Sequence, residues 1–233
     1  MFKHFLKKQL PPGLRYDIRK WLTLTGHIFT DIYLYLRYGK VLKKHSREKV
    51  DLLINFGCGP NLHPGWINID KSTNKGVYYH DLRNPIPLCN NSVLHINAEH
   101  FLEHLEIFYA KKFLSECHRI LKPGGTIRIS VPDAERYIDA YYKNNTEFFE
   151  PLVNLGGSSE KFQTKIEIIN QMFRMADSHL FAWDFETLEL YVRTSKFVNI
   201  KRSEYKSGDF NIDGNDWWRP HESLYIVAQK QIN

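Results

Sequence analysis

Hydrophobic positions along the chain follow two different periods. From residue 14 to about residue 44, apolar side chains recur at intervals of three and four positions, which predicts a long amphipathic helix. Beyond residue 50, short apolar runs take over, bounded by the Gly, Pro, Asn and Asp residues that typically flank strands. These runs occupy residues 51–56, 66–70, 77–81, 93–97 and 126–131.

A second helix is expected between the last two of these strands. Residues 99–121 place their apolar side chains on one helical face, and Pro123 with two following glycines ends the pattern. Strands in series with helices and loops predict an α/β fold, a Rossmann-like, doubly wound and mostly parallel sheet with helices on both faces. Only nine residues, 57–65, join the first two strands. The first crossover is therefore predicted to be a shortened loop without a helix.

Positive charge gathers at the start of the chain. Residues 1–50 hold twelve Lys and Arg against three acids, whereas residues 51–233 hold twenty against twenty-three. A nucleic-acid groove would run as a basic stripe across the body, so no nucleic-acid partner is expected. The basic helix is predicted to pack on its own domain or on a second subunit as a homodimer. The alternative is an amphipathic helix lying on an anionic membrane surface.

Cysteine content and hydropathy indicate where in the cell the protein is expected to be located. The three cysteines, Cys58, Cys89 and Cys117, form no C-x-x-C pair, so neither a disulfide framework nor a zinc ribbon is indicated. No run approaches the ~18 apolar residues of a membrane span, and no secretion signal is recognisable at the N-terminus. The expected location is the cytoplasm, with peripheral binding to the inner face of the membrane as the alternative.

Residues suited to a nucleoside ligand follow three of the predicted strands. In an open parallel sheet, ligands bind in the crevice outside the carboxyl ends of the strands. Asn55-Phe56-Gly57-Cys58-Gly59-Pro60 closes the first strand, and its alternating glycines allow a ligand close to the backbone. Asp70 ends the second strand, where a carboxylate can accept hydrogen bonds from ribose hydroxyls. Asp81-Leu82 ends the third.

These segments resemble the class I S-adenosylmethionine-dependent methyltransferases. The likeness is to methyltransferases of type 11, and in particular to a small bacterial branch associated with surface-polysaccharide biosynthesis. The turn Leu121-Lys122-Pro123-Gly124-Gly125, at its distance from the first glycine loop, is quite specific to them. The segments that carry the resemblance are residues 54–70, 91–105, 114–133, 179–188 and 222–230.

The resemblance implies S-adenosyl-L-methionine as cofactor, with contacts that can be assigned residue by residue. Gly57, Cys58 and Gly59 would line its methionine part, Asp70 its ribose, and Asp81 with Leu82 its adenine. The segment Asn97-Ala98-Glu99 would pass beside the sulfonium, and Asn55, Phe56 and Pro60 complete the set. Two positions depart from the pattern. Asn55 stands where an acidic residue is usual, and Leu94 stands where Asp is common.

The expected reaction is transfer of the methyl group to a small-molecule or glycan acceptor, at an oxygen atom. Because a hydroxyl must lose its proton, a histidine base would help. His104 and His100 are the first candidates and His179 the third. The spacing His100-x-x-Glu103-His104 also fits a zinc inverzincin motif, but no third ligand is identifiable by spacing, and no metal is expected.

Two other classes of function stay open on these residues. A non-catalytic module that binds the cofactor or a partner would keep the glycine loop. A nicotinamide oxidoreductase should have G-x-G-x-x-G opening a helix, whereas Gly59 is followed here by Pro60-Asn61.

The chain is divided accordingly into a basic helical leader over residues 1–44 and a methyltransferase domain over 45–233. Within that domain, residues 144–180 form a candidate lid over the acceptor. Trp217 and Trp218 are candidates for stacking on a sugar ring.

Overall fold

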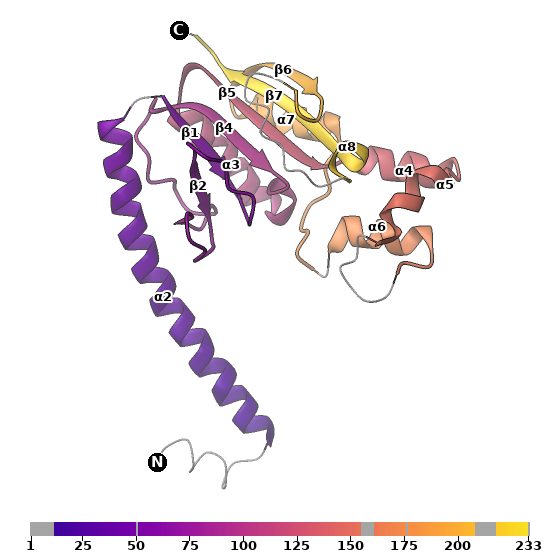
Figure 1. The fold of residues 1–233 in the computed structure, drawn as a ribbon, viewed down its shortest axis with the longest axis horizontal. Coiled ribbons are helices and arrows are strands. Elements are labelled where there is room, and N and C mark those ends of the chain that lie inside the picture. The colour runs from indigo at the N-terminus through magenta and orange to yellow at the C-terminus, as the bar shows by residue number, and fades with distance from the viewer. Residues whose placement is uncertain (1–11, 50, 155–160, 176, 208–217, 233) are drawn as a thin grey trace.

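A seven-stranded sheet forms the centre of the chain, in the order β3-β2-β1-β4-β5-β7-β6 (Figure 1). The computed structural model describes residues 12–49, 51–154, 161–175, 177–207 and 218–232, and the side chains in these ranges from residue 29 onward. Strands β1 to β5 run parallel to one another, and β7 runs antiparallel between β5 and β6. The strands are β1 (Leu52–Phe56), β2 (Ile67–Asp70), β3 (Tyr78–Tyr79), β4 (Val93–Glu99), β5 (Leu121–Pro132), β6 (Phe197–Ser203) and β7 (Ser223–Lys230). The predicted mostly parallel α/β sheet is confirmed.

The connection from β1 to β2 contains no helix, as its length predicts. The two strands are direct neighbours, with Ile54 opposite Ile67 and Phe56 opposite Ile69. In place of a packed helix, the buried Asn68 side chain holds the loop. It accepts a hydrogen bond from His63 N at 2.9 Å and donates to the carbonyls of His63 and Trp66. Hydrogen bonds to the Asn68 amide therefore hold the end of the loop that leads into β2.

The helix expected over residues 99–121 begins later than predicted. Strand β4 continues to Glu99, which pairs with Ser130 of β5, and His100 turns the chain with a left-handed φ of +46°. A short 3₁₀ turn, η1 (Leu102–His104), precedes α3 (Ile107–Ile120). His100 and His104 therefore do not share a helical face. The apolar periodicity was misleading because Leu102 and Leu105 are buried from a turn rather than from a helix.

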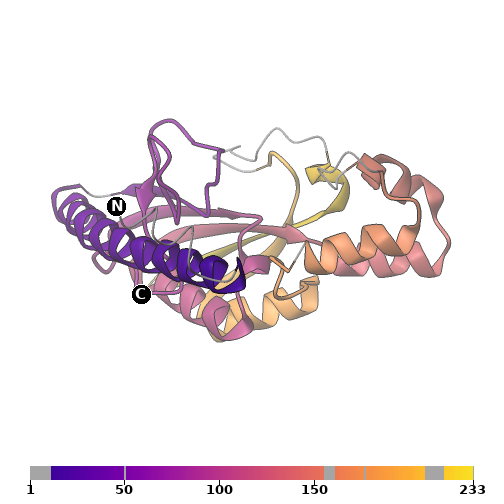
Figure 2. The ribbon, with the colours of Figure 1, turned by 90° about the horizontal axis from the view of Figure 1, so that it is seen from below.

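Helices α3 and α7 (Phe185–Thr194) lie on the same face of the sheet (Figure 2). Their apolar faces, with Phe113, Leu114 and Leu188 fully buried, join the side chains of the central strands in one core. This burial fixes the sheet as a rigid support, from which the loops at the carboxyl ends of the strands project.

A smaller helical group follows β5 and extends from the ends of the strands (Figure 1). It consists of α4 (Ala134–Tyr142), α5 (Thr146–Phe149), the 3₁₀ turn η2 (Glu150–Asn154) and α6 (Lys165–Arg174). Buried Tyr137, Phe149, Leu152 and Met172 belong to an apolar cluster of its own, separate from the main core. The candidate lid falls largely in this group, although its residues 155–160 and 176 lie outside the described residues.

The leader forms one long helix, α2 (Pro12–Glu48), whose later turns pack against the β3 edge of the sheet. The Tyr35 ring stacks on the buried His80 ring, and the Tyr79 hydroxyl donates to Asp31 at 2.5 Å. Leu42 is completely buried. The helix continues away from the sheet toward its N-terminal end (Figure 1). Among the described residues, no helix has the length and hydropathy to cross a lipid bilayer.

Candidate active site

Two adjoining cavities open at the carboxyl ends of the parallel strands. The first has a volume of about 590 Å³ and lies between the glycine loop and the helical group. The second, of about 270 Å³, lies between the ends of β2 and β3 and the turn after β4. His104 lines both cavities. Together they form one cleft at the position where parallel α/β sheets bind ligands.

The glycine loop after β1 depends on its two glycines in different ways. Both adopt left-handed backbone angles, with φ of +61° at Gly57 and +50° at Gly59. A Cβ on Gly57 would lie 2.5 Å from the ring of Phe101, whereas a Cβ on Gly59 would have no atom within 4 Å. The Phe101 ring thus packs directly against Gly57, and it leaves no room for a side chain at this position of the loop. Gly59 faces open space in the first cavity.

Three asparagines support this loop from behind. The buried Asn55 side chain donates to Asn61 O and to Asn68 Oδ1, each at 3.0 Å, and accepts from Asn97 Nδ2 at 3.1 Å. An amide can donate and accept in this way, whereas an ionised carboxylate could only accept. The asparagine at position 55 is therefore explained by the short β1–β2 connection, which it ties to the neighbouring strands.

Asp70 connects the end of β2 to the glycine loop. Its carboxylate Oδ2 accepts a hydrogen bond from Gly59 N at 2.8 Å, and Gly57 N donates to Ile69 O at 2.9 Å. Between the two glycines, Cys58 is buried, and burial followed by the nearby charge of Asp70 raises the pKa of its thiol to about 12. Cys58 is therefore a neutral thiol at physiological pH and unsuited to act as a nucleophile.

Asp81 and Leu82 line the second cavity, but the Asp81 carboxylate is already paired. It forms a bidentate ion pair with Arg83, and Lys71 lies 3.6 Å from it. The hydrogen bond from Arg83 lowers the pKa of Asp81 to about 2, so this group stays ionised. Lys71 also lies 3.5 Å from Asp31 of α2. The buried Leu82 side chain supplies an apolar wall beside Phe101.

The remaining predicted cofactor residues are divided between the cavity wall and the core. Cys58, Pro60 and Glu99 line the first cavity. Phe56, Asn97 and Ala98 are buried in the sheet behind it and line neither cavity. The Glu99 carboxylate is held by Arg219 at 3.0 Å.

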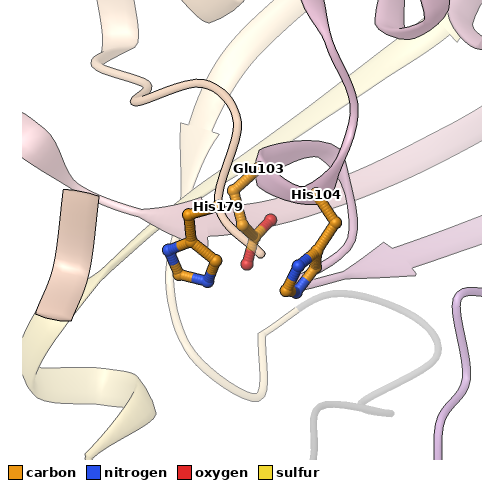
Figure 3. Close-up of side chains that lie close together, drawn as sticks. All are labelled: Glu103, His104 and His179. Carbon is orange, nitrogen blue, oxygen red and sulfur yellow. The ribbon is translucent and has the colours of Figure 1, made fainter. Parts of the chain in front are cut away.

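His100, His104 and His179 all line the first cavity, although their surroundings differ. His100 is held on both sides, because its Nε2 lies 2.7 Å from Ser223 Oγ and its Nδ1 lies 3.2 Å from Glu103 Oε1. The rings of His104 and His179 meet edge to face, with centroids 4.8 Å apart. Figure 3 shows His104, His179 and Glu103 pointing toward one another.

The sequence analysis gave Glu222 no role at the cavity, which it lines together with Tyr137. The Tyr137 hydroxyl donates to the buried Glu222 carboxyl, whose pKa is raised by burial. The only signal in the sequence is indirect. Because β7 is antiparallel to β5, with Ser223 opposite Pro132, residues just before β7 reach the edge where the parallel strands end. Trp218 also lines the cavity, whereas Trp217 lies outside the described residues.

A family model described as a methyltransferase domain matches residues 55–129, which run from the glycine loop to strand β5. Over these residues the chain is similar to methyltransferase domains. The matched segment contains the glycine loop, Asp70, Asp81 and Glu103, which line one side of the double cleft.

The chain is similar to several solved structures at low sequence identity. A SAM-dependent methyltransferase from Archaeoglobus fulgidus is 17% identical, with a TM-score of 0.51 over 82% of this chain and 94% of that one. One from Methanosarcina mazei is 13% identical, with a TM-score of 0.48 over 79% and 94%. Phosphoethanolamine N-methyltransferase 2 of Haemonchus contortus, in complex with S-adenosyl-L-methionine, is 11% identical, with a TM-score of 0.44 over 78% and 49%. Among curated proteins, no relative matches the chain.

Proposed function

We propose that the protein is an S-adenosylmethionine-dependent methyltransferase, which transfers the methyl group of this cofactor to an oxygen of a hydroxyl-bearing small molecule or glycan. The observation that supports this acceptor most is the composition of the first cavity. Histidine, carboxyl and amide groups surround it, with the rings of Tyr137 and Trp218 among them. Polar groups with aromatic faces suit a sugar ring, which offers hydroxyls at its edge and C–H groups on its faces.

The cofactor is proposed to span both cavities. Its adenosine part would occupy the second, with Asp70 accepting from the ribose hydroxyls and Leu82 and Phe101 packing on the base. Its methionine part would lie along Gly57, Cys58 and Gly59. This placement agrees with the surroundings of the two glycines, because the space beside Gly59 is empty whereas the Phe101 ring fills the space beside Gly57. It directs the sulfonium methyl group toward the first cavity, where the acceptor would bind.

His104 and His179 are proposed to activate the acceptor. The methyl group of a sulfonium is already electrophilic, so the protein has to align acceptor, carbon and sulfur and to remove a hydroxyl proton. Each of these histidines uses its Nδ1 for a backbone carbonyl, which leaves Nε2 for the cavity. His100 is a positioning residue because Ser223 and Glu103 already occupy its ring nitrogens.

Release of S-adenosylhomocysteine tests the acceptor class, because it accompanies methyl transfer to any acceptor. The purified full chain is incubated with S-adenosylmethionine and a panel of sugar nucleotides, lipid-linked saccharides, amines and carboxylic acids. We expect turnover only with hydroxyl-bearing saccharides, and mass spectrometry should locate the added methyl group on oxygen. Turnover confined to the amines or the carboxylic acids would contradict the proposal, and so would no turnover with any member although the cofactor binds.

The leader helix is proposed to rest on an anionic membrane surface. Phe29, Ile32, Tyr33 and Leu36 are all more than half exposed, with Phe29 at 74%, and their spacing places them on one stripe of α2. Four cations in the following turns are exposed as well, namely Lys40, Lys43, Lys44 and Arg47. An apolar stripe with adjacent cations complements lipid chains and anionic headgroups, and each cation near such a surface contributes about 1 kcal/mol.

Vesicle co-sedimentation tests this surface. The full chain should sediment with vesicles that contain phosphatidylserine, less so with neutral vesicles, and least at high salt. The double variant Phe29→Ser, Leu36→Ser should lose this binding, while Phe108→Ser, which removes an exposed Phe from α3, should retain it. Deleting the leader is unsuitable because Leu42 is part of the core. Equal binding to anionic and neutral vesicles would contradict the proposal. A dimer in the unchanged protein that dissociates in the double variant would also contradict it, because the apolar stripe would then contact a second copy of the chain.

A further inference from the structure

Glu103, His104 and His179 bring three metal-ligand atoms together at the cavity. One nitrogen from each imidazole and one carboxylate oxygen all lie within 4.8 Å of one another. Glu103 and His104 come from η1, and His179 comes from the segment before α7, seventy-five residues later. Figure 3 shows the three side chains converging on a common space. The spacing between the pair and its third member gave no sequence signal, because only the fold brings them together.

Backbone hydrogen bonds hold the two segments in this arrangement. Leu180 N and Phe181 N both donate to Glu103 O, at 2.7 and 3.3 Å. The position of His179 relative to η1 is therefore set by the main chain and not by the side chains themselves. A site built in this way is fixed before any ligand binds.

The hydrogen bonds of the two imidazoles are those of metal ligands. His104 Nδ1 lies 3.1 Å from Ser178 O, and His179 Nδ1 lies 2.6 Å from Met172 O. A carbonyl can only accept, so each Nδ1 carries the proton and each Nε2 presents its lone pair to the cavity. Histidines that bind metals commonly have their second nitrogen fixed by such a carbonyl.

The carboxylate has the burial and charge that a cation site requires. Glu103 is only 2% exposed, and its Oε2 has no hydrogen-bond partner within the described part of the chain. A buried carboxylate at the edge of a cavity, with one oxygen unpaired, attracts a cation.

We propose that Glu103, His104 and His179 bind a divalent transition-metal ion, whereas the sequence predicted that no metal is bound. Two imidazoles and one carboxylate suit zinc, manganese or iron, and three protein ligands leave coordination positions open to a substrate oxygen. The ion's role rests on the proposed function, whereas its binding does not. Bound to the ion, the acceptor hydroxyl would lose its proton to water. The oxygen would then form the bond to the methyl carbon as the carbon–sulfur bond breaks and its electron pair stays on sulfur.

Calorimetric titration of the full chain, purified without a histidine tag and stripped with chelator, tests the site with Zn²⁺ and Mn²⁺ separately. We expect saturation near one ion per chain with at least one of these metals. Affinity should fall at least ~100-fold in His179→Ala and in Glu103→Gln, beyond the 10–100-fold typical of losing an outer hydrogen bond to a ligand. His118→Ala removes a histidine of α3 that packs on Phe197, and it should leave affinity unchanged.

Titration of the same samples with S-adenosylhomocysteine separates this site from the cofactor site. All three variants should bind S-adenosylhomocysteine as the unchanged protein does, which also shows that they are folded. If Glu103→Gln does not fold, His179→Ala decides the result, since His179 lies on a connecting segment and is only half-buried. No saturable metal binding, or equal metal affinity in His179→Ala, would overturn the site and leave the methyltransferase function intact.

Discussion

Replacing Gly57 with valine is expected to abolish binding of S-adenosylhomocysteine while the chain stays folded. The added Cβ would lie 2.5 Å from the Phe101 ring, and valine is also poorly suited to a φ of +61°. Such a backbone angle alone costs about 1–3 kcal/mol in a residue other than glycine. The loop must therefore move, and its close approach to the cofactor is lost. Calorimetric titration should find affinity reduced by at least about 100-fold, since about 1.4 kcal/mol corresponds to a factor of ten.

Gly59→Ala is the matched control for this substitution. Its φ of +50° is as unfavourable for alanine, but its Cβ would have no atom within 4 Å. Only the backbone cost of about 1–2 kcal/mol remains, so affinity should fall roughly tenfold. Circular dichroism should confirm that both variants are folded. Unchanged affinity in folded Gly57→Val would show that the cofactor does not use this loop.

Replacing His104 with alanine is expected to lower turnover by about 10²–10⁴-fold, the range that loss of acid–base assistance typically produces. His104 presents Nε2 to the cavity in which the acceptor is proposed to bind, while its Nδ1 is held by Ser178 O. Removing it leaves the glycine loop and Asp70 untouched, so affinity for S-adenosylhomocysteine should stay nearly constant. Steady-state kinetics with the acceptor found in the panel, together with a titration, separates these effects.

Chelator treatment of the unchanged protein shows how His104 acts. If chelation lowers turnover as much as His104→Ala does, then the histidine acts through a bound cation. If chelation has no effect and His104→Ala still costs turnover, then the imidazole itself accepts the proton. A loss of less than about tenfold in His104→Ala would contradict both roles and leave His104 as a structural residue of η1.

Local patterns predicted the sheet well because a short apolar run must be buried on both faces of a parallel sheet. Residues 51–56, 66–70 and 93–97 all match strands within one or two residues. The run 77–81 yields only the two-residue strand β3 at the sheet edge. Residues 99–106 were wrongly predicted as helix, because apolar spacing does not distinguish a helix from a buried turn that follows a strand.

The candidate site was predictable only where its residues follow strand ends directly. Asp70 and the glycine loop have that position, and both line the cleft. His179 reaches Glu103 through main-chain contacts between distant segments, and Glu222 reaches the cavity through the antiparallel pairing of β7. Neither contact has a local sequence pattern, because each joins segments that only the completed fold brings together.

Lys71 connects the leader helix to the cleft, since it lies 3.5 Å from Asp31 of α2 and 3.6 Å from Asp81 in the second cavity. Any ligand that displaces α2 from the sheet edge therefore also changes the charge balance at Asp81. Because such linkage is reciprocal, a cofactor that binds beside Asp81 would bias the position of α2 by the same factor. Lys71 is half exposed, and an exposed ion pair contributes at most about 1 kcal/mol, so the coupling reaches no more than about fivefold. Displacement of the leader would thus change occupancy of the cleft by that factor at most, which is too small for this single lysine to act as a switch.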